Sequence, residues 1–301
     1  MTQFLIISST KDKASRNIKD KLLSSKIGVF ELARPRWHNN HLFKLDNNGV
    51  EDPEKRKILD EIEVFLGVTN ERLIFLNDLK LNKSEIKPDI VIFASRHSSK
   101  TGRPSFLVHT TGNWTGDIRY GGEGKKLSHA SALLLKAGYN SIIKKVNKYS
   151  MNGFSIDIEV THHGPALDIP LLFMELGSKP SEWHHNKAGV VLGDAIIETI
   201  FKYKQYEKEN SQKIGVGFGG THYAPQFQRL INDNNIAVSF ICPKYFIRSL
   251  NEDLIEQILN NNLEKIDYFI LDWSGLNSAD KDHLLPLLEK YKIPIKKIKD
   301  F

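Results

Sequence analysis

Short apolar runs alternate with amphipathic stretches along the chain. Residues 4–7 are all apolar and form a run of four, which is typical of a buried strand. Residues 130–146 place apolar side chains three or four positions apart and lysines on the other face, which predicts a helix. Residues 154–160 alternate strictly between apolar and polar side chains, as a half-buried strand does.

The same patterns predict strands and helices in alternation from end to end. Strands are expected at residues 4–7, 72–76, 90–94, 106–108, 154–160, 171–174, 214–218, 237–241 and 268–271. Helices are expected from a cap at Ser8-Ser9-Thr10 through residue 23, and at 130–146, 186–206, 224–234, 250–262 and 279–291. Such alternation favours an α/β fold, a single domain over residues 1–301 with a largely parallel central sheet flanked by helices. Residues 34–70 are polar and irregular, and we interpret them as an insertion or lid.

Composition excludes several classes of protein. The 301 residues are 40% hydrophobic and 26% charged with mixed signs, which argues against disorder. No apolar run approaches the roughly 18 residues of a membrane span, and the N-terminal run is too short for a signal peptide. We therefore expect a soluble cytoplasmic protein without membrane association. The single cysteine, Cys242, allows no intramolecular disulfide, and the net charge of +6 attracts polyanions only weakly.

Four polar clusters, each with a histidine, follow predicted strands. They are Ser95-Arg96-His97-Ser98-Ser99, His109-Thr110-Thr111-Gly112-Asn113-Trp114, Thr161-His162-His163-Gly164-Pro165 and Gly219-Gly220-Thr221-His222-Tyr223-Ala224-Pro225. Glu175 follows a further strand, and Trp183-His184-His185 begins the next helix. The carboxyl ends of strands form the ligand crevice of open α/β sheets, so we expect these groups to meet there.

Histidine and glutamate side chains suit a zinc site, which for catalysis needs three ligands and an open position. The candidate ligands are His162, Glu175, His184 and His222, and the candidate catalytic residues are His97, Thr110, His163 and Thr221. Neighbours on an extended backbone face opposite ways, so only one of His162 and His163 is expected to face a given metal. The alternative is that individual histidines only hydrogen-bond the loop backbone.

Two further groups have both a functional and a structural interpretation. The amides of Gly219 and Gly220, or the Thr110 hydroxyl, could stabilise an oxyanion, whereas the glycines could instead form a tight turn. Asp157 and Glu159 lie on the polar face of their predicted strand, where they could bind a substrate ammonium group or form a structural pair.

A basic segment covers residues 119–148, with no acidic residue between positions 123 and 157. Its candidate tRNA-binding residues are Arg119, Lys125, Lys126, Lys144, Lys145 and Lys148. A lysine-rich helix face is usually only solvated, but beside a histidine-rich crevice it could follow a phosphate backbone.

At these clusters the sequence resembles the archaeal and plant type of D-aminoacyl-tRNA deacylase. The resemblance rests on the four clusters and on Glu175 through Ser178 with Trp183, in matching order and spacing over most of the chain. It implies a monomeric α/β hydrolase, similar in fold to peptidyl-tRNA hydrolases and nucleoside phosphorylases, with no obligate protein partner. It also implies removal of D-amino acids from mischarged tRNA with zinc as cofactor, and it assigns no zinc ligand.

The candidate residues suit cleavage of the ester between an amino acid and the terminal ribose of tRNA, which needs only a modest nucleophile. Two alternatives remain open. One is a zinc-dependent peptidase or amidohydrolase acting on small substrates. The other is a tRNA-binding protein without catalysis, whose histidines contact phosphates.

Overall fold

The computed structural model describes residues 1–25, 27–47, 50–233 and 235–301, and the statements below concern these residues. One sheet has the strand order β2-β3-β4-β1-β5-β8-β6-β7, and a second has the order β10-β9-β11-β12. The first comprises β1 (Thr2–Ser9), β2 (Val29–Trp37), β3 (Asn40–Asp46), β4 (Ile62–Thr69), β5 (Ile90–Arg96), β6 (Ser105–His109), β7 (Ser155–Ile158) and β8 (Leu171–Gly177). The second comprises β9 (Lys213–Phe218), β10 (Ile236–Cys242), β11 (Tyr268–Leu271) and β12 (Ile295–Lys297).

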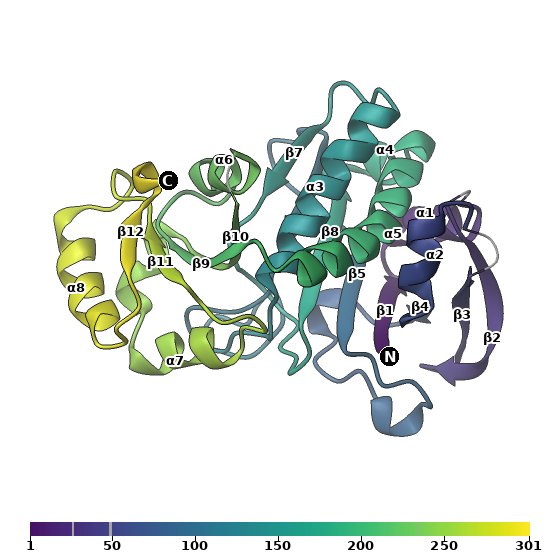
Figure 1. The fold of residues 1–301 in the computed structure, drawn as a ribbon, viewed down its shortest axis with the longest axis horizontal. Coiled ribbons are helices and arrows are strands. Elements are labelled where there is room, and N and C mark those ends of the chain that lie inside the picture. The colour runs from purple at the N-terminus through teal and green to yellow at the C-terminus, as the bar shows by residue number, and fades with distance from the viewer. Residues whose placement is uncertain (26, 48–49, 234) are drawn as a thin grey trace.

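Helices connect most of these strands (Figure 1). They are α1 (Lys13–Leu23), α2 (Pro53–Leu59), α3 (Ala132–Lys148), α4 (Pro180–Trp183), α5 (Asn186–Glu209), α6 (Pro225–Asp233), α7 (Glu252–Asn260) and α8 (Ser278–Glu289). None of the helices in the described ranges is long and apolar enough to cross a membrane.

Strand directions confirm the predicted α/β fold with a largely parallel sheet. Neighbours β4, β1, β5 and β8 are parallel, and so are all neighbours in the second sheet. The exceptions lie at the sides of the first sheet, where β2 and β3 are antiparallel and β6 runs against β8. β7 is parallel to β6, so this pair points the opposite way to β5 and β8.

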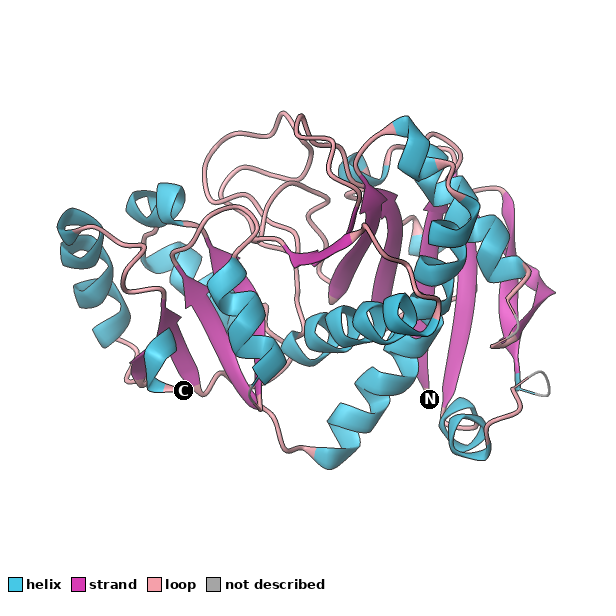
Figure 2. Ribbon diagram, turned by 90° about the horizontal axis from the view of Figure 1, so that it is seen from above, coloured by secondary structure: helices cyan, strands magenta, loops and turns pink. Residues whose placement is uncertain are grey.

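The two faces of the first sheet differ in what covers them. Helices α1, α3 and α5 lie on one face (Figure 1), over an apolar cluster that includes Ile92 and Leu172 and extends to Val216 in the second sheet. The other face carries a second cluster that includes Phe93 and Phe173, whose rings stack 4.5 Å apart. Long loops gather between the two groups of strands (Figure 2).

Several predicted elements are wrong. Residues 34–70 are not irregular, because they include the end of β2, all of β3 and α2, and β4, which pairs with β1 along its whole length. The expected strand at 72–76 is a 3₁₀ turn, η2 (Leu73–Phe75), and the cap of α1 is Asp12, which accepts from the N–H of Ser15. The alternating strand ends at Ile158, because the chain then turns to the second sheet, where Thr161 N–H donates to Ile241 O in β10.

Candidate active site

A cavity of about 580 Å³ lies at the carboxyl ends of strands in the first sheet, lined by residues that end β5 and β8 or follow β1 and β4. All four predicted clusters contribute to its wall, which includes His97, His162, His163, Glu175 and His222. The structure therefore brings together most of the residues that the sequence marked for chemistry.

The predicted reason for this convergence is only partly right. β5 and β8 end side by side and deliver His97 and Glu175, as expected for parallel strands. His109, however, ends β6, which runs the other way, so it lies opposite Phe173 in β8 and stacks on that ring at 5.3 Å. His222 comes from the second sheet, after β9. The cavity thus lies at the carboxyl ends of β1, β4, β5 and β8, and loops that include His162, His163 and His222 complete its wall.

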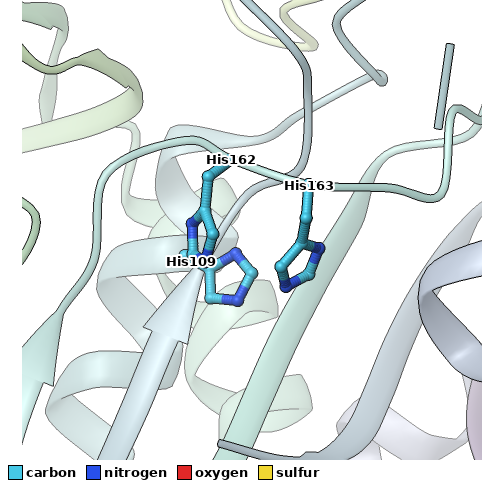
Figure 3. A group of neighbouring side chains, drawn as sticks. All are labelled: His109, His162 and His163. Atoms are coloured by element: carbon cyan, nitrogen blue, oxygen red, sulfur yellow. The ribbon is translucent and has the colours of Figure 1, made fainter. Parts of the chain in front are cut away.

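Three histidines form the centre of the site (Figure 3). The ring centroids of His109, His162 and His163 lie 4.3–4.7 Å apart. Each Nδ1 faces a backbone carbonyl: that of Thr110 at 3.1 Å, Val160 at 2.7 Å and Gly164 at 2.6 Å respectively. A carbonyl only accepts, so each Nδ1 carries a proton and each Nε2 is the ring atom left to face a ligand.

His162 and His163 face the same side, contrary to the prediction from an extended backbone. His163 has a left-handed backbone conformation, with φ of 42°. This reversal breaks the strand-like alternation, so both side chains extend from one loop toward His109 (Figure 3). A left-handed residue other than glycine is uncommon and costs strain, which the surrounding contacts must offset.

Burial divides the histidines by protonation state. Burial and the neighbouring histidine rings lower the pKa of His162 well below its usual value, and burial and His109 lower the pKa of His163 to about 4. Both are neutral near pH 7, as metal ligands must be. Burial opposes protonation of His97 and His109 too, but Glu175 and Glu159 outweigh it and raise the pKa of both, so a metal bound at His109 would displace a proton.

Two buried glutamates lie among these rings. Glu175 Oε2 is 3.3 Å from His97 Nδ1, and its Oε1 is 3.8 Å from His109 Nε2. Burial opposes ionisation of Glu175, yet the neighbouring His109 and His97 rings outweigh it and lower its pKa. Glu159 Oε2 lies 3.6 Å from His97 Nδ1, and Oε1 lies 2.8 Å from His222 Nε2.

Several of these buried atoms lack a hydrogen bond. Among the described residues, neither oxygen of Glu159 nor Nε2 of His109 has a hydrogen-bond partner, and the 2.8 Å contact with His222 lacks hydrogen-bond geometry. Buried acceptors left unpaired are costly, and a cation would offset that cost.

The donor atoms fall into three groups that could hold a metal ion. They are His109 with His162 and His163, Glu159 with His162 and His222, and His97 with Glu159 and Glu175, each with its ligand atoms within 4.8 Å of one another. Imidazole and carboxylate groups are ligands that zinc prefers, so the residues fit that metal. His109 and Glu159 were missing from the predicted ligands. The sequence signal for His109 was its place directly after a buried strand, as for the other clusters.

His184 does not join these groups. It is exposed at the end of α4, and its Nδ1 donates to Pro180 O. It is also absent from the cavity wall.

The candidates for oxyanion and ammonium binding mostly have structural contacts. The Thr110 hydroxyl donates to Ser239 O in β10, and Gly219 N–H donates to Cys242 O. Gly219 and Gly220 have φ of 108° and 82°, as the tight-turn interpretation expects. Thr221 is exposed and outside the cavity wall. Asp157 pairs with Arg103 at 2.6 Å, which is the structural pair considered for it.

The predicted tRNA-binding residues lie on two different faces. Lys144 and Lys145 of α3 both contact Glu198 of α5, on the face of the first sheet away from the histidines. Lys145 is buried and cannot reach a phosphate, and Lys148 ends the same helix. In contrast, Arg119 lines the cavity, where it pairs with Asp117 at 2.6 Å.

Lys125 and Lys126 lie in the same loop segment as Arg119. Lys125 is exposed, and Lys126 contacts Glu123 at 3.5 Å. This loop is therefore the part of the basic segment that adjoins the cavity.

Comparison with known proteins gives a consistent family. A model of the D-aminoacyl-tRNA deacylase family matches residues 84–296. The chain is 32% identical over 275 residues to the D-aminoacyl-tRNA deacylase of Pyrococcus furiosus, covering 90% of this chain and 91% of that protein. It is 39% identical over 211 residues to that of Sulfurisphaera tokodaii, covering 70% and 84% respectively. The crystal structure of a conserved protein of unknown function superposes with a TM-score of 0.80 at 29% identity, covering 99% of this chain and 96% of that one.

Proposed function

The chain belongs to the D-aminoacyl-tRNA deacylase family, and on that premise we propose that its cluster of histidines and glutamates is the deacylation centre. The protein hydrolyses the ester bond between a D-amino acid and the terminal ribose of tRNA, releasing both. One observation carries the assignment of the centre. His109, His162 and His163 converge beside two buried carboxylates at a cavity of about 580 Å³, whose wall includes His162, His163 and Glu175.

We propose that His109, His162 and His163 hold a zinc ion through their Nε2 atoms. Their Nδ1–H groups are held by backbone carbonyls, which fixes each ring in the tautomer that a metal needs. The unpaired Glu159 carboxylate supplies negative charge nearby. Bound zinc would supply Lewis-acid activation of the ester carbonyl.

His97 is the residue we propose for proton transfer. Its Nδ1 faces Glu175 at 3.3 Å, and its Nε2 lies 3.5 Å from the Tyr223 hydroxyl. Glu175 therefore fixes the ring, and Nε2 is the atom that can give a proton to the departing ribose oxygen. The contact between Trp183 Nε1–H and His97 O, at 2.8 Å, holds the backbone of His97 in place.

The experiment compares hydrolysis of one tRNA charged with the D and the L form of the same amino acid. Rapid release from the D form, lost on treatment with a chelator and restored by zinc, is the expected result. Equal rates on both forms would contradict the D-specific activity, and full activity in protein shown to be metal-free would contradict the zinc assignment. Competition by uncharged tRNA separates this enzyme from a small-substrate peptidase, which tRNA should not inhibit.

We further propose that the protein works as a monomer in the cytoplasm. In support, the described residues of a single chain supply both the histidines and the carboxylates of the cavity. Light scattering at the concentration used for activity tests the monomer, and activity confined to a dimer peak would contradict it.

A further inference from the structure

The cavity extends beyond the histidines to three basic side chains. Lys11, Arg72 and Arg96 line it together with His97. They come directly after β1, after β4 and at the end of β5, which are neighbouring parallel strands in the order β4-β1-β5. β1 and β4 finish in register, with Ser9 opposite Thr69, so the basic residues emerge from the same edge of the sheet.

These three residues, which we call the cationic wall, have little opposing charge. Arg119 across the cavity is paired with Asp117, but within the described ranges no carboxylate forms an ion pair with Lys11, Arg72 or Arg96. Asp12 lies beside them, and its carboxylate already accepts from the N–H groups of Ser15 and Arg96.

Aromatic rings orient the two arginines of the cationic wall. The guanidinium of Arg72 lies 4.9 Å from the Phe75 ring centre, and that of Arg96 lies 5.2 Å from the Trp183 ring centre. Such stacking orients a guanidinium and leaves its N–H donors free for an anion. Guanidinium groups match the geometry of phosphate oxygens, which favours a phosphate as the ligand.

We propose that the cationic wall binds the 5′-phosphate of the terminal nucleotide of the charged tRNA. This inference rests on the proposed function, which places the ester at the histidines. The phosphate is attached to the same ribose as the ester, so it must lie within one sugar of the reacting carbon. The cationic wall adjoins His97 in the same cavity, which is where that phosphate would fall. Phosphate recognition would make the enzyme selective for esters of nucleotides over free amino acid esters.

The test uses two fragments: a D-aminoacyl ester of adenosine, and the same ester carrying a 5′-phosphate. For the wild type we expect kcat/KM to be roughly 10–100-fold higher on the phosphorylated fragment, the usual range for a bond between charged groups. Arg72→Gln should raise KM for the phosphorylated fragment and so abolish most of this difference in kcat/KM. Arg72→Lys should restore part of the difference. Arg34→Gln, at an exposed arginine of edge strand β2, is the matched control and should keep the full ratio.

The possible results separate this proposal from the proposed function. A wild type that hydrolyses both fragments equally well would overturn phosphate binding but leave the deacylase intact. Equal losses on both fragments in Arg72→Gln would also overturn it, because the arginine would then act on the shape of the site. Hydrolysis of D-aminoacyl-tRNA but of neither fragment would place recognition elsewhere on the tRNA and overturn it too. No hydrolysis of any of the three substrates would refute the proposed function itself.

Discussion

Replacing Glu159 with Gln should make the metal-free protein more stable while it impairs the enzyme. Glu159 is 1% exposed, and neither of its oxygens has a hydrogen-bond partner among the described residues. A buried polar group left unpaired costs about 1–3 kcal/mol, and more when it is charged. Gln keeps the shape of the side chain and removes the buried charge. We therefore expect a gain of about 2 kcal/mol in the free energy of unfolding.

Thermal unfolding in the presence and absence of chelator measures this effect. At this chain length a gain of about 2 kcal/mol corresponds to a rise in Tm of roughly 3 °C. Zinc at about 100 times its Kd should stabilise the wild type by about 2.7 kcal/mol, and the variant by less because its affinity falls. Glu31→Gln, at an exposed glutamate of β2, is the control and should change neither Tm. A chelated Glu159→Gln protein less stable than the chelated wild type would refute the reasoning.

Three other predictions concern the site and the core. His109→Ala should lower kcat by at least about 100-fold with little change in tRNA affinity, whereas His184→Ala should stay near the wild type, as single-turnover assays can check. Burial opposes ionisation of Glu198, but its contacts with Lys144, Lys55 and Lys145 outweigh burial and lower its pKa to about 2. The stability that this ionised carboxylate supplies is therefore fully present above about pH 4.5 and is lost as the pH falls toward 2. Glu198→Gln should therefore lower the free energy of unfolding at pH 7 by roughly 3 kcal/mol, and this difference from the wild type should shrink in acid denaturation curves. Gly219→Ala should cost about 1–3 kcal/mol in urea unfolding, because φ is 108° and its Cβ would lie 3.1 Å from Asp272 Cβ; an unchanged midpoint would contradict the strain.

The sequence predicted the central strands well because their apolar runs are strong local signals. The predicted strand at residues 268–271 has the bounds of β11, and the observed strands β5 and β8 end only two or three residues later than predicted. The error over residues 34–70 has a physical cause. β2 is an edge strand whose side chains are largely exposed, and its sequence, VFELARPRW, lacks a regular alternation and contains a proline, so it resembles a loop. Because β2 was not recognised, the apolar run of β4 was not predicted as a strand either.

The site was predicted in its membership more than in its geometry. The histidines and glycines of the clusters identified which residues belong to the site. Two features of its geometry, the direction of β6 and the backbone conformation of His163, depend on the tertiary structure. The direction of β6 relative to β8 decides how His109 meets Glu175, and strand direction leaves no trace in a short apolar run. The left-handed conformation of His163 decides where its ring lies, and no local rule assigns that conformation to a histidine beside a glycine.

Residues 159–163 join the two sheets and also carry the chemistry. Thr161 N–H donates to Ile241 O, and Ile241 N–H donates to the Thr161 hydroxyl, so two hydrogen bonds join this short segment to β10. Glu159, His162 and His163 all belong to this five-residue segment. A small rotation of one sheet against the other would therefore change the spacing of the ligands before either sheet lost a strand. Heat or mutation at this boundary should abolish activity while most of the secondary structure persists, so the enzyme's own turnover reports how well the two sheets are docked.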